Sequence, residues 1–134
     1  MAQRRIVPVT DYDQLIITRE AQTAVALGDV CTYHTDYIKV IPAATSAPQA
    51  NIVGVALDAG AAGDDVRLCI RGVCDARVDG DTTDADVGDA LLPSTAVAGE
   101  LRSTGAVPAD TKVDRIICAE ANAGTVALVR VFVT

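Results

Sequence analysis

The chain has 134 residues, a formal net charge of −7 and an apolar fraction of one half. This length fits one domain, or two very small ones that share a core. An acidic chain without clustered Lys and Arg argues against a nucleic-acid partner, and the absence of an apolar run of about 18 residues excludes a membrane-spanning helix. The first residues lack the apolar region of a secretory signal, so we expect synthesis in a cytoplasm and four cysteines that are thiols.

The apolar residues are unusually poor in aromatic side chains, which are limited to Tyr12, Tyr33, Tyr37 and Phe132. Burying a Val, Leu or Ile contributes roughly 1.5–3 kcal/mol and burying an Ala much less, while ordering each residue costs about 1–2 kcal/mol of backbone entropy. A core made mainly of Val and Ala therefore predicts a marginal monomer. We expect the chain to bury further surface, either against copies of itself or against a larger protein.

The first third of the chain predicts an extended arm followed by short strands. Residues 1–10 contain Pro8 and no helical pattern, so they are expected to be extended. A strand is expected around residues 15–18, and residues 30–33 and 37–41 are expected to form a hairpin. Residues 21–26 are ambiguous between helix and strand, and residues 42–49 read as a loop.

The central stretch, residues 51–78, predicts three strands with two breaks. The strands are residues 52–57, 66–71 and 73–78, and Gly72 is expected to form a bulge or a corner between the last two. In the middle strand a period of two places Val66, Leu68 and Ile70 against a core. The same period places Arg67, Cys69 and Arg71 on the other face.

The second half of the chain repeats the outline of the first at an offset of about sixty residues. Gly28-Asp29-Val30 is echoed by Gly88-Asp89-Ala90, and residues 52–70 are echoed by residues 116–131. We therefore expect an all-β fold, a small antiparallel β-barrel or β-sandwich. Residues 1–20 would form the arm and first strand, and residues 21–134 a single β-domain with a possible internal repeat of 28–78 and 88–133.

Two other segments of the second half have distinct patterns. Residues 79–89 form an acidic loop that is expected to be too polar for burial. Residues 126–133 are apolar on both faces except for Arg130, a pattern typical of a central strand or of one whose outer face meets another subunit.

Residues that could carry chemistry are few, and no catalytic, cofactor or metal site is predicted. Cys31 and His34 could be half of a zinc site with Cys69 and Cys74, but zinc sites prefer closely spaced cysteine pairs on turns, and these residues fall in predicted strands. The acidic loop lacks the EF-hand pattern, so a solvated turn is favoured over a loose cation site. The single histidine has no partner at the spacing of a catalytic triad, and there is no nucleophile elbow.

Several motifs together resemble those of the capsid decoration, or cement, proteins of tailed bacteriophages. The resemblance covers about residues 25–133 and departs from the family pattern at Cys118-Ala119-Glu120. It is carried by Gly28-Asp29-Val30, by residues 52–59 (IVGVALDA), by residues 61–66 (AAGDDV), by Ile70-Arg71-Gly72-Val73, by Gly88-Asp89-Ala90-Leu91 and by residues 119–133.

This resemblance implies a non-enzymatic virion protein that is made in the host cytoplasm and binds the capsid exterior. The implied partners are the major capsid protein and copies of the chain itself, as a homotrimer that stabilises the expanded shell. Residues 1–19 are expected to contribute capsid or inter-subunit contacts, in particular Arg4, Arg5, Ile6, Val7, Pro8 and Tyr12. The alternatives are a receptor- or carbohydrate-binding virion module resembling a head fibre and, less favoured, a metal-dependent hydrolase.

Overall fold

The computed structural model describes residues 14–35, 38–81, 83–103 and 116–134, and these residues form an all-β fold. The predicted fold class is therefore confirmed. No helix in this part of the chain is long and apolar enough to cross a membrane. The elements are β1 (Leu15–Glu20), β2 (Val30–Tyr33), β3 (Val40–Pro42), the 3-10 helix η2 (Gln49–Asn51), β4 (Ile52–Ala56), β5 (Asp65–Asp79), β6 (Leu91–Pro93), β7 (Leu101–Ser103), β8 (Ile116–Cys118) and β9 (Ala127–Val133).

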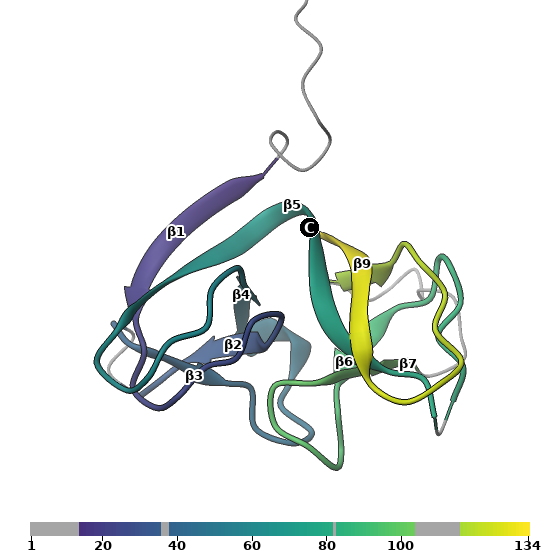
Figure 1. Ribbon diagram of the computed structural model, residues 1–134, viewed down its shortest axis with the longest axis horizontal. Coiled ribbons are helices and arrows are strands. Elements are labelled where there is room, and N and C mark those ends of the chain that lie inside the picture. The colour runs from purple at the N-terminus through teal and green to yellow at the C-terminus, as the bar shows by residue number, and fades with distance from the viewer. Residues whose placement is uncertain (1–13, 36–37, 82, 104–115) are drawn as a thin grey trace, which may run out of the picture.

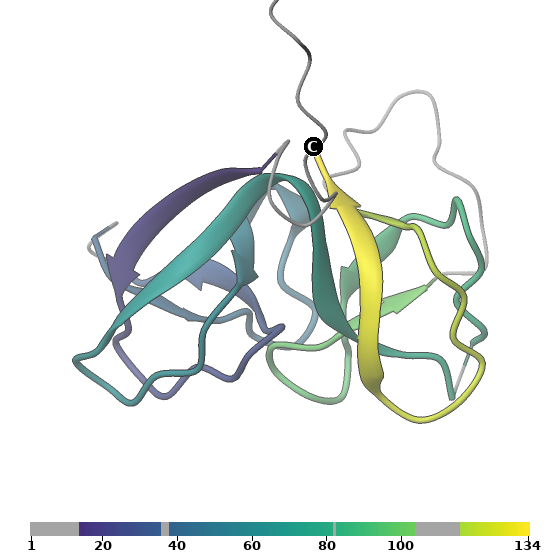
Figure 2. The same cartoon turned by 45° about the horizontal axis from the view of Figure 1, so that its top comes forward.

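The strands form one sheet that, over the described residues, is not closed into a barrel. Its main path is β3-β2-β4-β5-β7-β6, with β1 added to β5 and with β9 pairing both β5 and β8. Every strand pair is antiparallel except β5 with β7. Figures 1 and 2 show two lobes side by side, with β1 to β4 in one and β6 to β9 in the other, and β5 running through both.

The long strand β5 bends at Gly72 without ending there. The sequence predicts two separate strands at this point, and that prediction is wrong because Asp65–Asp79 is one continuous strand. Gly72 has a φ of +111°, a backbone conformation that residues with a Cβ rarely adopt. The first half of β5 pairs with β1 and β4, and the second half pairs with β9, beginning at Gly72 opposite Val133. The chain therefore ends beside the bend (Figure 1).

Cys69 departs from the predicted alternation along β5. Arg67 and Arg71 are exposed as expected, but Cys69 is fully buried. Its neighbour Leu68 packs in one hydrophobic cluster and Cys69 in another, so β5 is covered on both faces at this point. The register between β1 and β5 also shifts next to Cys69, because Leu15 pairs with Arg71 and the following Ile16 pairs with Cys69. Such a β-bulge changes the direction in which nearby side chains point.

Two hydrophobic clusters hold the lobes, and their buried members are all aliphatic residues or cysteines. The smaller cluster lies in the first lobe and contains Ala21, Val25, Cys31, Val40, Val53, Ala56, Val66 and Leu68. The larger cluster draws on both lobes and contains Val30, Ala43, Ile52, Val55, Cys69, Cys74, Ala76, Val78, Ala85, Leu91, Leu101, Ile116, Cys118, Val129, Val131 and Val133. The lobes are therefore not separate folding cores, because the larger cluster needs residues from both.

The same backbone hydrogen bonds recur in the two lobes. In the first, Gly28 N–H donates to Ala56 O and Ala56 N–H donates to Asp29 O, at 2.9 and 2.8 Å. In the second, Gly88 N–H donates to Cys118 O and Cys118 N–H to Asp89 O, each at 2.8 Å. Further matching pairs are the reciprocal bonds of Val25 with Gly60 and of Ala85 with Asn122, and the bonds Leu57 N–H to Arg67 O and Ala119 N–H to Arg130 O. These matches let a position in one lobe be compared with its counterpart in the other.

The acidic loop, residues 79–89, is less exposed than the sequence predicts. Asp81, Asp84 and Asp86 are exposed, but Asp89 is buried. Its carboxylate accepts hydrogen bonds from the backbone N–H of Asp86 at 3.0 Å and from Ser103 Oγ at 2.7 Å. A buried carboxylate is tolerated when such donors replace water, which is why the prediction is wrong at this residue.

Candidate functional site

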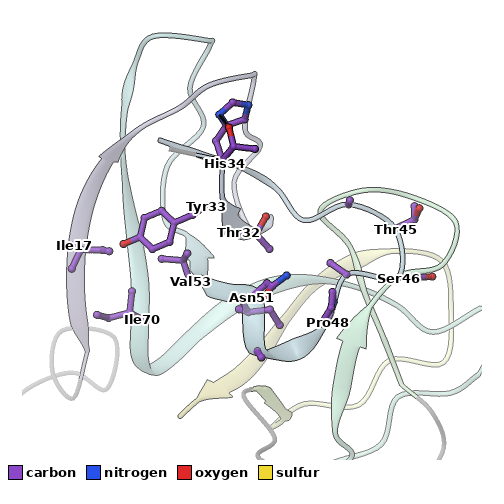
Figure 3. A pocket seen from close by; sticks show the side chains of 15 residues that line it. Ile17, Thr32, Tyr33, His34, Thr45, Ser46, Pro48, Asn51, Val53 and Ile70 are labelled. Carbon is purple, nitrogen blue, oxygen red and sulfur yellow. Dashed lines mark hydrogen bonds between the residues drawn. The ribbon is translucent and has the colours of Figure 1, made fainter. Parts of the chain in front are cut away.

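A groove of about 830 Å³ lies in the first lobe, between β1, β2 and the loop that leads to β4. Its volume falls in the range of small-molecule sites, roughly 300–1,000 Å³. Figure 3 shows Ile17, Tyr33, Val53 and Ile70 at one end and Thr45, Ser46 and Pro48 at the other. The lining is Ile17, Thr32, Tyr33, His34, Thr35, Ala44, Thr45, Ser46, Ala47, Pro48, Ala50, Asn51, Ile52, Val53 and Ile70.

Among the residues that the structure describes, the lining of this groove contains no Asp, Glu, Lys or Arg. Its polar groups are hydroxyls, the Asn51 amide and the His34 imidazole, whose Nδ1 lies 3.3 Å from Thr35 Oγ1. Within the described part of the lining, no carboxylate is present to orient His34 as a general base. These lining residues can hold a neutral ligand through hydrogen bonds and apolar contact.

The wall of the groove at Ser46 is tied to the second lobe. Ser46 is the non-glycine residue with a positive φ in the described part of the chain, at +61°. Its backbone N–H donates to Ser94 O at 2.8 Å. Such backbone strain persists only where the surrounding structure fixes it. The hydrogen bond to Ser94 supplies that constraint, so the shape of this wall depends on both lobes.

An ion cluster joins the two lobes beneath the turn that precedes β2. The Arg77 guanidinium binds Asp29 Oδ1 through Nη1 at 2.6 Å and Glu100 Oε2 through Nη2 at 2.8 Å. The side chains of Asp29 and Glu100 are 5% and 8% exposed, and among the described residues Arg77 is the cation that pairs with both carboxylates. Asp29, Arg77 and Glu100 are not among the residues that line the groove, and their ion pairs join the two lobes.

A second, smaller hollow of about 180 Å³ lies on the outer face of the sheet formed by β5 and β9. Leu27, Leu57 and Leu128 are among its apolar lining residues, and Asp75 and Arg130 are its charged ones. Leu27 is 47% exposed, Leu128 is 48% exposed and the nearby Phe132 is 44% exposed. The complete lining is Gln14, Leu27, Leu57, Val73, Cys74, Asp75, Leu128 and Arg130.

The contact residues predicted from the resemblance cannot be placed, because they lie outside the described residues. This applies to Arg4, Arg5, Ile6, Val7, Pro8 and Tyr12. The sequence predicts for residues 126–133 either a central strand or a strand whose outer face meets another subunit, and the structure leaves Leu128 and Phe132 of β9 exposed. Neither the groove nor the ion cluster was predicted from the sequence. For the ion cluster the sequence does contain a signal, because Arg77 is a cation within a largely apolar predicted strand.

The cysteines and the histidine do not come together as metal ligands. Cys31 lies in the core of the first lobe with its thiol 3.6 Å from Asp29 O, whereas His34 lines the groove. Within the described ranges, no group of three His, Cys, Asp or Glu could hold a metal ion. All four cysteines are free and buried. Burial raises the pKa of the Cys31 and Cys118 thiols, and hydrogen bonding with Cys69 together with burial raises that of Cys74, so these three stay protonated at neutral pH.

No family model and no curated protein matches the chain, but its fold is similar to that of a solved phage protein. That protein is the N base of the head fibre gp8.5 of bacteriophage phi29, with a TM-score of 0.62 and 19% sequence identity. The match covers 90% of this chain and 94% of the N base. The two proteins therefore share their fold over nearly their whole lengths, including both lobes.

Proposed function

We propose that this chain is a structural protein of a tailed-phage virion that attaches to the outside of the head. The observation that carries the proposal is the shared fold with a head fibre base, which spans both lobes and 94% of that base. The capsid-decoration motifs in residues 25–133 support the same location. The major capsid protein would be the partner, and no cofactor or enzymatic step is required.

We further propose that the chain forms a homotrimer that stabilises the expanded shell of the phage head. Two features of the structure support this proposal. The buried core is aliphatic, so the isolated chain gains little free energy per residue from burial. Several large apolar side chains, among them Leu15, Ile16 and Phe132, remain 40–54% exposed. Binding to a shell would stabilise the folded chain by mass action, and the shell would gain the same coupling free energy.

The test is to mix the purified chain with expanded shells that lack surface proteins. The chain should sediment with the shells in saturable amounts and should raise the temperature at which the shells disrupt. Deleting residues 1–10, which include Arg4, Arg5, Ile6, Val7 and Pro8, should abolish binding while leaving the β-fold measured by circular dichroism. Failure of the intact chain to bind any expanded shell of its own phage would overturn the proposal.

A second candidate is a receptor- or carbohydrate-binding virion module, and it is favoured by the groove, whose described lining carries no Asp, Glu, Lys or Arg. Hydroxyl groups and the Tyr33 ring in a groove of about 830 Å³ suit a neutral polyhydroxylated ligand. Titration with neutral oligosaccharides, followed by NMR, should then shift the signals of Tyr33, His34 and Asn51. Unchanged signals at millimolar sugar would remove this candidate. Nothing in the described residues favours a metal-dependent hydrolase.

A further inference from the structure

The outer face of β9 presents apolar side chains that the fold itself does not bury. Phe132 lies opposite Val73 of β5 and Ile117 of β8, and Leu128 lies opposite Arg77. These cross-strand partners share one face of the sheet. We call this surface the β9 face and define it by Leu27, Leu57, Val73, Leu128 and Phe132, with Asp75 and Arg130 among them.

One position of this face, that of Leu128, has a polar counterpart in the first lobe, which gives the chain an internal comparison. Arg67 and Arg130 are counterparts, because each carbonyl accepts the matching backbone bond and each N–H donates to an acidic side chain, Asp58 Oδ2 or Glu120 Oε1. Counting two residues back from each, exposed Leu128 corresponds to exposed Asp65. An apolar residue at this position is therefore not required by the fold.

The charged residues of the β9 face are also less well paired than their counterparts. Arg67 binds Asp58 through two side-chain hydrogen bonds of 2.9 Å. Arg130 reaches only to 4.0 Å from Asp75, and both side chains are more than half exposed. Each is thus available to an opposite charge on another molecule. The chain carries a net charge of −7, so two copies repel over most of their surfaces. Contact is favoured at a face that presents both charges, where Arg130 of one copy can approach Asp75 of another.

The β9 face also contains a projection and a hollow of matching size. The whole hollow, whose lining includes Leu27, Leu57 and Leu128, has a volume of about 180 Å³, and Phe132 is not part of its lining. An apolar cavity of about 150 Å³ is large enough to bind benzene, so this hollow can accept a phenyl ring. Phe132 is four residues beyond Leu128 on the same strand, about 13 Å away, and is 44% exposed.

We propose that the β9 face is a self-association surface, in which Phe132 of one copy enters the hollow between Leu27, Leu57 and Leu128 of another. The projection and the hollow are different places on one face, so the contact closes either reciprocally between two copies or as a ring of three. In the homotrimer of the proposed function, this contact is the ring contact. The inference does not require shell binding, and the two ideas are tested separately.

The experiment measures the mass of the intact chain in solution over a range of concentrations, by light scattering and mass photometry. Phe132→Asp and Leu27→Asp should each weaken self-association at least tenfold. The matched control is Val87→Asp. Val87 occupies the same place as Leu27 in the repeated turn, one residue before a glycine with positive φ, and is 68% exposed, but it does not line the hollow. The Val87→Asp variant should self-associate like the unmodified chain. Circular dichroism should show that all three variants fold.

A second measurement tests the contact directly by cross-linking. Phe132→Cys and Leu27→Cys chains, mixed and oxidised with copper phenanthroline, should form a disulfide between copies, which neither variant forms alone to the same extent. The native cysteines are buried, but Cys74 lines the hollow, so both variants are made in a Cys74→Ala chain.

Three results would overturn the inference. The first is a chain that is monomeric at every concentration. The second is self-association that Phe132→Asp and Leu27→Asp leave unchanged, including the case in which only removal of residues 1–13 alters it. The third is a monomer whose shell binding is lost in Phe132→Asp, which would assign the β9 face to the capsid protein. A chain that self-associates through this face and binds no shell would support the inference and overturn the proposed function.

Discussion

Arg77 Nη1 lies 2.6 Å from Asp29 Oδ1, and this contact connects the second half of β5 to the turn that begins β2. The same guanidinium holds Glu100, just before β7, at 2.8 Å. Arg77 is the residue that can serve both, because a guanidinium presents several donors in a fixed plane. Its backbone N–H also donates to Gly28 O at 2.9 Å, so both its backbone and its side chain fix the turn.

Replacing Arg77 should destabilise the chain strongly. Arg77→Ala would leave the buried carboxylates of Asp29 and Glu100 without a cation, and removing one partner of a buried pair costs about 3–5 kcal/mol. We expect about 3 kcal/mol, because the Arg77 side chain is 28% exposed, and a smaller loss for Arg77→Lys. Urea unfolding measures both. Lys39→Ala, which breaks the exposed contact with Glu20, should cost less than about 1 kcal/mol, and equal losses for the two alanine variants would contradict this account.

The two repeated turns should respond differently to the same substitution. Gly28 and Gly88 have φ values of +86° and +94°, so an alanine is strained at either, by about 1–2 kcal/mol. A Cβ at Gly88 would meet nothing within 4 Å. At Gly28 it would overlap Leu128 Cδ2 and lie 3.2 Å from the Arg77 backbone nitrogen. Gly28→Ala should therefore lower the thermal midpoint more than Gly88→Ala, and the reverse order would show that the contacts at Gly28 are not as described.

The exposed pair of Asp58 and Arg67 should contribute to stability in a pH-dependent way. Hydrogen bonding to Arg67 lowers the pKa of Asp58 below its ordinary value. A lowered folded-state pKa means that the contribution is complete above the unfolded-state pKa of about 3.9 and is lost as the pH falls through the folded-state value. Asp58→Asn should thus be slightly less stable than the unmodified chain at pH 7, and the difference should shrink in acid. A difference independent of pH in thermal unfolding would rule out the ionic cause.

The four cysteines should be unreactive in the folded chain. All are buried thiols, and burial raises the pKa of Cys31 and Cys118. Hydrogen bonding with Cys69, together with burial, raises the pKa of Cys74, whereas the same hydrogen bond lowers the pKa of Cys69, so the protection of Cys69 rests on its burial alone. A disulfide-exchange reagent such as DTNB should label them slowly at pH 8 and should label four per chain in denaturant. Rapid labelling of one thiol under native conditions would identify a site that opens locally.

Much of the local structure follows from the sequence because it depends on nearest neighbours. The strand around residues 15–18 and the pairing of residues 30–33 with the next strand were predicted from alternation and turn residues, and both are confirmed by β1 and by the β2–β3 pair. The recurrence of Gly-Asp before a strand also predicts the matching turns at Asp29 and Asp89. In each turn the carboxylate accepts a backbone N–H three residues earlier, from Ala26 or Asp86.

Other features were decided by contacts that no local pattern contains. The sequence predicts a break at Gly72, yet β5 continues because β9 pairs with it from Gly72 onward. Cys69 was predicted to face outward, but a second cluster covers that face. Asp89 was predicted to be exposed, but Ser103, distant in sequence, supplies a donor that makes its burial tolerable.

The sequence by itself determined that the chain is built of short aliphatic strands with a repeated turn, because side-chain alternation and glycine placement act over a few residues. Only the tertiary structure decided which apolar side chains of β9 stay exposed and which carboxylates share Arg77. Those outcomes depend on contacts between segments that are distant in the sequence and lie in two lobes. Burial and charge pairing arise from these contacts, so no single segment determines them.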